Sequence, residues 1–425
     1  MKPSYAAFKK YYRRLMKFLP GGSKIHKATH RLKTMLKQAI LNCSMFEDMG
    51  LQYTGPVDGH NIERLIGALE WAKQQDEPTV VHVLTKKGRG YDRAEQAPED
   101  YHGVAPFDCD AGLAGGEETT FSSVFGEELA GLAERDSRIC AITASMTSGT
   151  GLGCFAERFP ERFFDVGIAE GHAVAMAAGM AICGAVPVFA VYSTFLQRAY
   201  DMMLHDVAIS GLHVIFAVDR AGLVPGDGET HQGLFDVAYL SSIPGMTVMC
   251  PASYAELRDM LSYAVGGLDG PVAVRYPRGC EGGYRDGGAD SVRRLREGAD
   301  FTIVTYGVNV NAALEAAETL DLEGISVEVI KLGRVCPIDG DSIISSVEKT
   351  GRLLVLEECS GRGSAGERIT ALLSMSRIAP ESVVLLNTGE LFAPCGEIDE
   401  LRKFCGVDAL SVCEAVRSAM RAGME

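Results

Sequence analysis

From residue 119 onward, short apolar runs alternate with longer segments that carry apolar residues at helical spacing. An unbroken run of roughly four to eight apolar residues is typical of a strand buried on both faces, and the helical period is typical of a helix with one buried face. The alternation therefore predicts an α/β fold, with a parallel sheet covered by helices on both sides. The predicted strands are 138–145, 186–193, 213–220, 247–252 and 271–278, and the predicted helices are 121–136, 166–179, 194–210 and 253–265.

A charged segment with several glycines, residues 280–299, interrupts this pattern and predicts a linker. The alternation then restarts, which indicates a second and smaller α/β domain. Its predicted strands are 300–307, 325–332, 352–358 and 382–388, and its predicted helices are 309–320, 343–350 and 364–374.

The first part of the chain carries a less regular pattern. Residues 1–40 are predicted to be helical, with a break at the Pro-Gly-Gly of 20–22. A helix over 61–75 is followed by a β-branched strand over 79–87. The stretch 108–118 is rich in glycine and acidic residues and predicts a domain boundary.

Composition and charge exclude several classes of protein. The chain has 425 residues, of which 47% are hydrophobic, so it can bury full cores and is not expected to be disordered. Its net charge of −15 argues against nucleic-acid binding. Residues 1–46 nevertheless hold eleven Lys or Arg and no Asp or Glu. A pair of solvated basic helices explains this segment better than a targeting peptide or a membrane-surface helix, because it lacks the apolar core of a secretory signal.

The cysteines and the hydrophobic runs bear on location. The sequence has no apolar run of about 18 residues, so no membrane span is expected. Its 12 cysteines are scattered without a CxxC pair, and several lie in apolar runs. This distribution favours reduced cysteines in a cytoplasmic protein over a disulfide framework or a zinc site.

The most informative segment is residues 166–179, VGIAEGHAVAMAAG. Apart from Glu170 and His172 it is small or apolar, which predicts a buried helix. A buried carboxylate is costly unless something binds it. From the residues alone, Glu170 is either a site for a ligand or a structural group, namely a helix N-cap or one half of a buried ion pair.

Three glycine-rich stretches are candidate ligand loops. GDGETHQG (226–233) follows a predicted strand, and loops at the carboxyl ends of parallel strands face the ligand crevice, so Asp227, His231 and Gln232 are candidate site residues. GRGSAG (361–366) fits a dinucleotide pattern, but the acidic residue such a site needs is poorly placed, and a packing turn is favoured. GTGLG (149–153) has less support still.

Seven stretches carry a family resemblance: GPVDGHN, VLTKKGRGY, YHGV, FFDVGIAEGHAVAMAAG, VYSTFLQRAYDMMLHDVAI, DRAGLVPGDGETHQG and VRYPRG. In this order they closely resemble 1-deoxy-D-xylulose-5-phosphate synthases, which are thiamine diphosphate enzymes of the transketolase superfamily. The resemblance runs from about residue 45 to near the end. It implies a transketolase-like α/β fold: a remnant of the diphosphate-binding domain (1–115), a pyrimidine-binding domain (116–290) and a transketolase C-terminal domain (296–425).

The resemblance also implies an activity. The family condenses pyruvate with D-glyceraldehyde 3-phosphate to 1-deoxy-D-xylulose 5-phosphate, with loss of carbon dioxide. Glu170 matches the glutamate that hydrogen-bonds N1′ of the aminopyrimidine, where a buried carboxyl group can share a proton with the ring. Tyr91 matches a residue that contacts the cofactor. Tyr192 and Phe195 match the pyrimidine pocket, although core aromatics remain an alternative for these two.

The substrate residues are also carried over by resemblance. Arg198 and Arg278 resemble the pair that holds the substrate phosphate, for which the planar arginine fork is suited. Asp227 and His231 match residues near the reacting carbonyls, and His102 matches another pocket histidine. A histidine that titrates near neutrality can move protons in the addition steps.

The sequence departs from the family in two respects. The family holds its magnesium diphosphate with a GDG motif followed at a distance by Asn, but this chain has no Asn between Asn61 and Asn309. The Mg²⁺ ligands are therefore expected on an N-terminal part of the family sequence that these residues do not include. In addition, Gly171 stands where the family usually has Gln, which leaves the local geometry open.

These departures leave several interpretations. The chain is expected to be inactive alone and to work as a homodimer or with a separate diphosphate-binding subunit. The alternatives are a non-catalytic fragment or binding protein of the same fold, or the β-type subunit of another split thiamine diphosphate enzyme. The nearest rival, a 2-oxo acid dehydrogenase β-subunit, would lack VDGHN, TKKGRGY and YHGV.

Overall fold

The computed structural model describes residues 44–98, 100–102, 104, 106–113 and 118–422, so the helices expected over 1–40 lie outside the described residues. The chain divides into two compact units, Met1–Gly115 and Gly116–Glu425. Among the described residues, no helix is both long enough and apolar enough to cross a membrane.

The described part of the smaller unit is built around a parallel pair of strands, β1 (Gln52–Asp58) and β2 (Thr79–Leu84), which helix α4 (Ile62–Lys73) connects. Asn61 caps α4 by accepting a hydrogen bond from the Arg64 amide, 3.0 Å. Short helices α3 (Ser44–Asp48) and α5 (Asp92–Gln96) flank this core. The predicted helix and second strand are confirmed. β1 was not predicted, because a Gly-Pro pair and a bulge interrupt its apolar pattern.

The larger unit begins with a seven-stranded sheet in the order β12-β7-β8-β6-β5-β3-β4. Six of the strands run parallel to one another: β3 (Ile139–Thr143), β4 (Phe163–Asp165), β5 (Val186–Tyr192), β6 (Ile215–Asp219), β7 (Thr247–Met249) and β8 (Val272–Arg275). Apart from the partly buried Tyr192 at the end of β5, the residues of β5, β6 and β8 are buried, as their continuous apolar runs predict.

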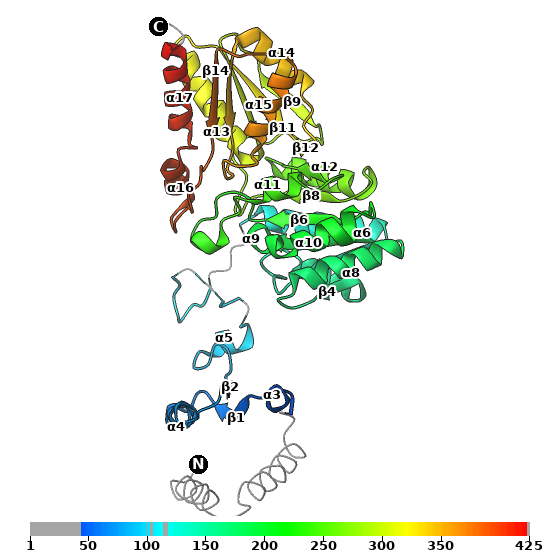
Figure 1. Cartoon of the computed structure of the whole chain (residues 1–425), viewed down its shortest axis with the longest axis vertical. Coiled ribbons are helices and arrows are strands. Elements are labelled where there is room, and N and C mark those ends of the chain that lie inside the picture. The colour runs from blue at the N-terminus through cyan, green and yellow to red at the C-terminus, as the bar shows by residue number, and fades with distance from the viewer. Residues whose placement is uncertain (1–43, 99, 103, 105, 114–117, 423–425) are drawn as a thin grey trace, which may run out of the picture. The chain divides into compact units, whose positions relative to one another are not determined.

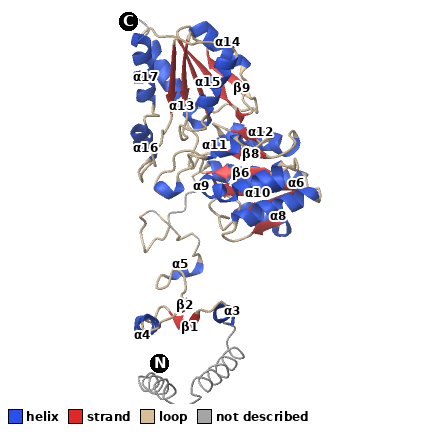
Figure 2. Ribbon diagram, viewed as in Figure 1, coloured by secondary structure: helices blue, strands red, loops and turns tan. Residues whose placement is uncertain are grey.

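Helices cover both faces of this sheet (Figures 1 and 2). Helices α6 (Phe121–Arg135) and α12 (Tyr254–Gly266) share one core with alternate strand residues, and α8 (Glu170–Ile182) packs in the core on the opposite face. Shorter helices are α7 (Gly153–Arg158) and α11 (Asp236–Ser241). The two-sided parallel sheet is therefore confirmed.

The predicted helix over 194–210 is helical but broken. It divides into α9 (Ser193–Leu196), a 3₁₀ turn (Gln197–Ala199), α10 (Tyr200–Met202) and a π-helical stretch (Met203–Ala208) that packs against α8. Such π-helical turns are frequent at functional sites.

The C-terminal half forms a five-stranded sheet in the order β14-β13-β10-β11-β9. Strands β10 (Phe301–Tyr306), β11 (Val327–Leu332), β13 (Arg352–Leu356) and β14 (Ser382–Leu386) are parallel, and β9 (Val292–Arg296) is antiparallel. Helices α13 (Val310–Asp321) and α17 (Ala409–Ala422) share a core on one face, and α14 (Asp341–Thr350) and α15 (Ala365–Met375) pack in the core on the other. Helix α16 (Ile398–Cys405) precedes α17.

Two strands correct the predicted boundaries. Residues 280–299 were predicted to be a linker, but β9 lies there; its arginine-rich sequence hid a half-buried edge strand. Strand β12 (Arg334–Cys336) belongs in sequence to the C-terminal half, yet it pairs antiparallel with β7 of the first sheet. The second half of the unit therefore completes a sheet of the first half.

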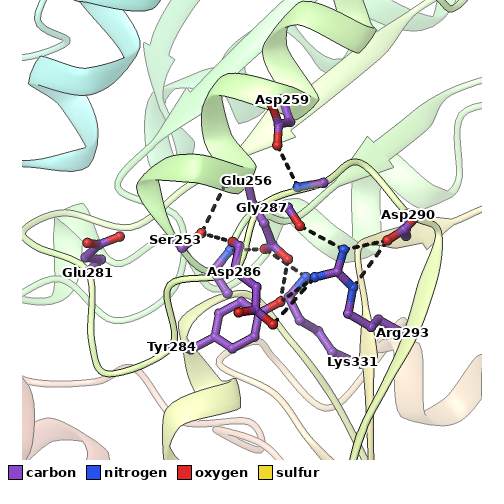
Figure 3. Close-up of polar contacts among 12 residues, drawn as sticks. Ser253, Glu256, Asp259, Glu281, Tyr284, Asp286, Gly287, Asp290, Arg293 and Lys331 are labelled. Atoms are coloured by element: carbon purple, nitrogen blue, oxygen red, sulfur yellow. Dashed lines mark hydrogen bonds and ion pairs between the residues drawn. The ribbon is translucent and has the colours of Figure 1, made fainter.

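A buried polar network also joins the two halves (Figure 3). The Glu256 carboxylate, on α12, accepts hydrogen bonds from Tyr284 Oη at 2.8 Å and from the Ala252 amide at 2.9 Å. It also pairs at 2.9 Å with Lys331 Nζ, which comes from β11. Both charged side chains are almost fully buried, so each needs the other to offset its desolvation.

Candidate active site

Glu170 is the first residue of α8 and is only 5% exposed. Ala169 is the N-cap residue, so the N-cap role considered for Glu170 does not apply. Its nearest charged partner is Arg198, whose Nε lies 3.9 Å from Glu170 Oε2 and whose side chain is 64% exposed. This contact is long and open to solvent, and it does not make a closed, buried ion pair.

The small residues of α8 have two separate uses. Ala173, Val174, Ala177 and Ala178 pack into the core. Gly171 faces Met202: a Cβ atom at position 171 would lie 2.7 Å from the Met202 methyl carbon. Gly171 therefore makes room for a methionine side chain beside Glu170, which is the structural counterpart of the departure from Gln seen in the sequence.

Three of the predicted site residues form a continuous aromatic wall. Tyr192, at the end of β5, stacks on Phe195 with ring centres 5.8 Å apart. His231 meets Phe195 edge-on at 5.4 Å. Thr194 Oγ1 donates a hydrogen bond of 3.0 Å to the Thr230 carbonyl, which ties the His231 loop to this wall.

Arg220 lies over this wall and was not predicted from the sequence. Its Cζ is 3.6 Å from the Tyr192 ring centre, and its Nη1 donates to the Gly149 carbonyl at 2.8 Å and pairs with buried Asp219 at 3.1 Å. Its Nε has no hydrogen-bond partner among the described residues, and its φ of 57° is unusual for a side-chain-bearing residue. Burial raises the pKa of Tyr192, and the Arg220 charge opposes that shift.

An open cavity of about 590 Å³ adjoins Arg220. Arg220 and Arg278 both line it, together with hydroxyl groups and backbone; the lining residues also include Ser122, Ser148 and Gly149 and the acidic Glu118 and Glu127. Two arginines and several hydroxyls in one cavity suit an anionic group with several oxygens.

The remaining predicted residues of this unit lie in two places. Arg278 Nη1 donates to Asp227 Oδ2 at 2.5 Å and to the Pro225 carbonyl at 3.0 Å. Arg198 does not line the cavity and lies instead beside Glu170. The sequence signal that could have found Arg220 is its place directly after β6, at the carboxyl edge of the sheet.

Tyr91 and His102 belong to the smaller unit. Tyr91 Oη donates to the Cys109 carbonyl at 2.9 Å, and its ring contacts Tyr101 and Phe107 with centres 5.4 and 6.1 Å away. His102 is exposed.

The glycine turn 361–366 is a packing turn, as predicted. The buried Glu357 carboxylate accepts hydrogen bonds from the Ala365 and Gly366 amides, 3.0 and 2.8 Å, at the start of α15. Tyr306 Oη also donates to it at 3.0 Å. The donors that a bound phosphate would need are already satisfied by the chain's own carboxylate.

Within the part of the chain that the structure describes, no group of three or more His, Cys, Asp or Glu side chains could hold a metal ion. The eleven described cysteines are all free.

Comparisons with known proteins agree with this fold. Residues 117–280 match the transketolase pyrimidine-binding domain, and residues 290–411 match the transketolase C-terminal domain. A solved structure titled "Split gene transketolase, inactive beta4 tetramer" superposes with a TM-score of 0.64 at 30% identity, over 72% of this chain and 99% of that chain. The fold and site therefore define a protein of the transketolase class.

The family is narrower than this class. Residues 1–85 match the 1-deoxy-D-xylulose-5-phosphate synthase model. The synthase of Clostridium kluyveri is 42% identical over 99% of this chain and 68% of its own length, and that of Desulforudis audaxviator is 44% identical over 98% and 66%. The chain belongs to the 1-deoxy-D-xylulose-5-phosphate synthase family, and it spans about two thirds of the length of these relatives.

Proposed function

We propose that this chain provides the pyrimidine-binding and C-terminal parts of a thiamine diphosphate-dependent synthase. The reaction condenses pyruvate with D-glyceraldehyde 3-phosphate, releases carbon dioxide and forms 1-deoxy-D-xylulose 5-phosphate. The observation that carries the proposal is the buried Glu170 carboxylate at the start of α8, in the unit that also holds the aromatic wall. Among the described residues, its single charged partner is the loosely placed Arg198.

The described residues suit one half of the cofactor. Glu170 can hold a proton at N1′ of the aminopyrimidine, and Tyr192 and Phe195 offer ring faces to pack against it. When bound, the cofactor supplies a thiazolium ring that accepts the electron pair released by decarboxylation. Among the described residues, no group of three or more His, Cys, Asp or Glu side chains could hold Mg²⁺. We assign Mg²⁺ and the diphosphate that it binds to another part of the enzyme. Tyr91 is retained as a cofactor contact.

For the substrates, we assign the aldehyde phosphate to the cavity lined by Arg220 and Arg278. Arg198, exposed beside Glu170, is placed to bind a substrate carboxylate or phosphate oxygen. Asp227 and His231, on the loop next to the wall, orient the reacting carbonyls and move protons. His102 is proposed for a further proton transfer.

The smaller unit offers a surface for a partner. On α4, Ile62, Ile66 and Leu69 fall on one stripe and are 49–70% exposed, and β1 and β2 form only a two-stranded parallel sheet among the described residues. Parallel strands are normally buried on both faces. We propose that the diphosphate-binding part of the enzyme covers this surface and that residues 1–425 have no turnover without it.

Self-association is a second part of this proposal. His172, Ala175, Gly179 and Ile182 are exposed on α8 at spacings of three and four, so they share one face. Small residues on a helix face allow close approach of another helix. We propose that this face joins two copies of the chain, as a homodimer or within a larger assembly.

The free cysteines fit a reducing compartment, and we place the protein in the cytoplasm.

The test is a reconstitution. The purified chain is assayed for 1-deoxy-D-xylulose 5-phosphate alone and after addition of the diphosphate-binding part of a relative. Turnover is expected only in the mixture, and Glu170→Gln should abolish it, whereas Glu161→Gln, at an exposed glutamate, should not. Turnover by the chain alone would contradict the need for a partner. A mixture that binds but never turns over would favour the non-catalytic alternatives.

A further inference from the structure

The loop that carries Asp227 and His231 has a tightly closed neck. Gly222 and Gly233 exchange two backbone hydrogen bonds of 2.8 Å. Inside this pair, the buried side-chain amide of Gln232 bonds the backbone of Val224. Its Oε1 accepts a hydrogen bond from the Val224 N–H at 2.8 Å, and its Nε2 donates to the Val224 carbonyl at 3.0 Å. These four hydrogen bonds close the base of the loop.

The neck is rooted in the C-terminal half of the unit. Leu223 and Leu234, which flank the loop, are each 1% exposed. They belong to the hydrophobic core of the five-stranded sheet, together with fully buried Ala393 and Leu401 of α16. The Ser360 amide also donates to the Leu234 carbonyl at 2.8 Å.

Glu358, which follows β13, provides the charged part of this root. It is 3% exposed, and its Oε2 accepts a hydrogen bond from the Leu223 amide at 3.1 Å. Its Oε1 pairs with Arg402 Nε on α16 at 2.8 Å. Gly222 leaves the room for it, since a Cβ atom there would lie 2.6 Å from Glu358 Oε2.

A second segment of the C-terminal half, residues 394–396, holds the loop from outside the neck. The Gly226 amide donates to the Gly396 carbonyl at 3.1 Å, and Cys395 Sγ donates to the Gly226 carbonyl at 3.1 Å. Gln232 Nε2 also donates to the Pro394 carbonyl at 3.3 Å. The loop is therefore bonded on two sides to a domain that contributes none of the predicted site residues.

We propose that the C-terminal domain positions the active-site loop, with Glu358 and the segment 394–396 fixing the place of Asp227 and His231. These residues act through the loop and are positioning residues. The inference rests on the proposed function for the importance of Asp227 and His231, but the attachment itself needs neither cofactor nor substrate to be measured.

The first test is a cross-link in the full chain. A Cβ atom on Gly228 would lie 3.6 Å from Cys395 Cβ, within the range of about 3.5–4.5 Å found in disulfides. Gly228→Cys is expected to form a disulfide with Cys395 on oxidation, and Cys395→Ala should remove it. Gly226→Cys is a matched control, because its φ of 82° is close to the 75° of Gly228 but no atom lies within 4 Å of its Cβ. Equal cross-linking at both positions, or at neither, overturns the proposal.

The second test is amide hydrogen exchange. Glu358→Leu removes the acceptor of the Leu223 amide, and exchange in residues 222–234 should rise about tenfold or more while β5 is unchanged. Glu358→Gln keeps an oxygen acceptor and should restore most of the protection. Unchanged loop exchange in a folded Glu358→Leu variant refutes the positioning role; if that variant does not fold, the cross-link decides. A Glu358→Leu variant that loses activity in the reconstituted enzyme while its loop exchange stays normal would also refute the positioning role. That result would leave the proposed function intact.

Discussion

The guanidinium carbon of Arg220 lies 3.6 Å from the centre of the Tyr192 ring. Strand register produces this contact, since Tyr192 ends β5 directly opposite Asp219 of β6, and Arg220 is the next residue. The Gly149 carbonyl and buried Asp219 then fix the guanidinium. A cation is thus held at the carboxyl edge of the sheet, on the wall assigned to the cofactor and at the rim of the cavity assigned to the phosphate.

Arg220→Lys tests this assignment. Lysine keeps the charge but loses the planar fork and the stacking on Tyr192. In the reconstituted enzyme we expect the KM for the phosphorylated aldehyde to rise about tenfold, which is a loss of about 1.4 kcal/mol, with little change in the KM for pyruvate. Steady-state kinetics with each substrate varied in turn measures this.

The control is Arg285→Lys. Arg285 is exposed, pairs with Glu281 and does not line the cavity. It should leave both KM values unchanged. Equal effects of the two variants, or a change confined to pyruvate, would show that Arg220 does not hold the phosphate.

The Glu256–Lys331 pair between the two halves should be costly to break from one side. Lys331→Met leaves the buried Glu256 carboxylate without its cation, and we expect the free energy of unfolding to fall by about 3–5 kcal/mol. Adding Glu256→Gln should recover part of this loss, because no buried charge is then unpaired. Urea denaturation of the two single variants and the double variant measures the coupling. Arg417→Met, which breaks a solvent-exposed pair with Glu323 on the same domain, should lower the free energy of unfolding far less. A fully additive double variant would contradict the pairing.

Thiol reactivity should follow burial. Burial raises the pKa of Cys250 to about 11, so about one thiol in a thousand is ionised at pH 8. Iodoacetamide at that pH should leave Cys250 unmodified in the native protein and label exposed Cys109, Cys183, Cys280 and Cys395, as read by peptide mass spectrometry. Labelling of Cys250 at the rate of the exposed set would contradict this assignment.

The same shift makes stability depend on pH. The folded pKa of Cys250 lies above the value of about 8.5 for an unfolded thiol, so its contribution is fully present below pH about 8.5 and is lost as the pH rises through about 11. Cys250→Ala should therefore show a shallower alkaline loss of stability than the wild type. Parallel curves for the two proteins would rule this contribution out.

Ile66→Glu tests the partner surface of the smaller unit. The Ile66 side chain is 49% exposed, so the change should alter the stability of the isolated chain by no more than about 0.5 kcal/mol. Binding of the diphosphate-binding part should nevertheless weaken strongly, because a charge would be buried in an apolar contact. Arg64→Glu, on the same helix about 160° around its axis, is the matched control and should bind normally. Titration calorimetry or co-elution distinguishes the two. Normal binding by Ile66→Glu would remove α4 from the interface.

Much of the fold could be predicted from local pattern. Strands such as β5 and β10 are buried on both faces, so their apolar runs needed no knowledge of their neighbours. β9 and β12 were missed for a shared physical reason: each is a short edge strand that owes its conformation to a neighbouring strand. The break in the helix over 194–210 likewise left no local signal.

The residues of the candidate site were also only partly predictable from the sequence. Glu170 could be found because a carboxylate among small apolar residues is conspicuous, and Asp227 and His231 because their loop follows a strand. Arg220 could not be distinguished from any other strand-end arginine until the register of β5 and β6 put it over Tyr192.

The sequence by itself determined the order of the elements, the two parallel sheets and the family, because burial and backbone preference act over a few neighbouring residues. Only the tertiary structure decided which charged groups meet. Arg220 lies with Arg278 in one cavity, and Arg198 remains beside Glu170. Glu358 accepts a hydrogen bond from Leu223, at the base of the Asp227 loop and 135 positions away along the chain. Such pairings depend on contacts between distant segments, and these form only when the sheets pack.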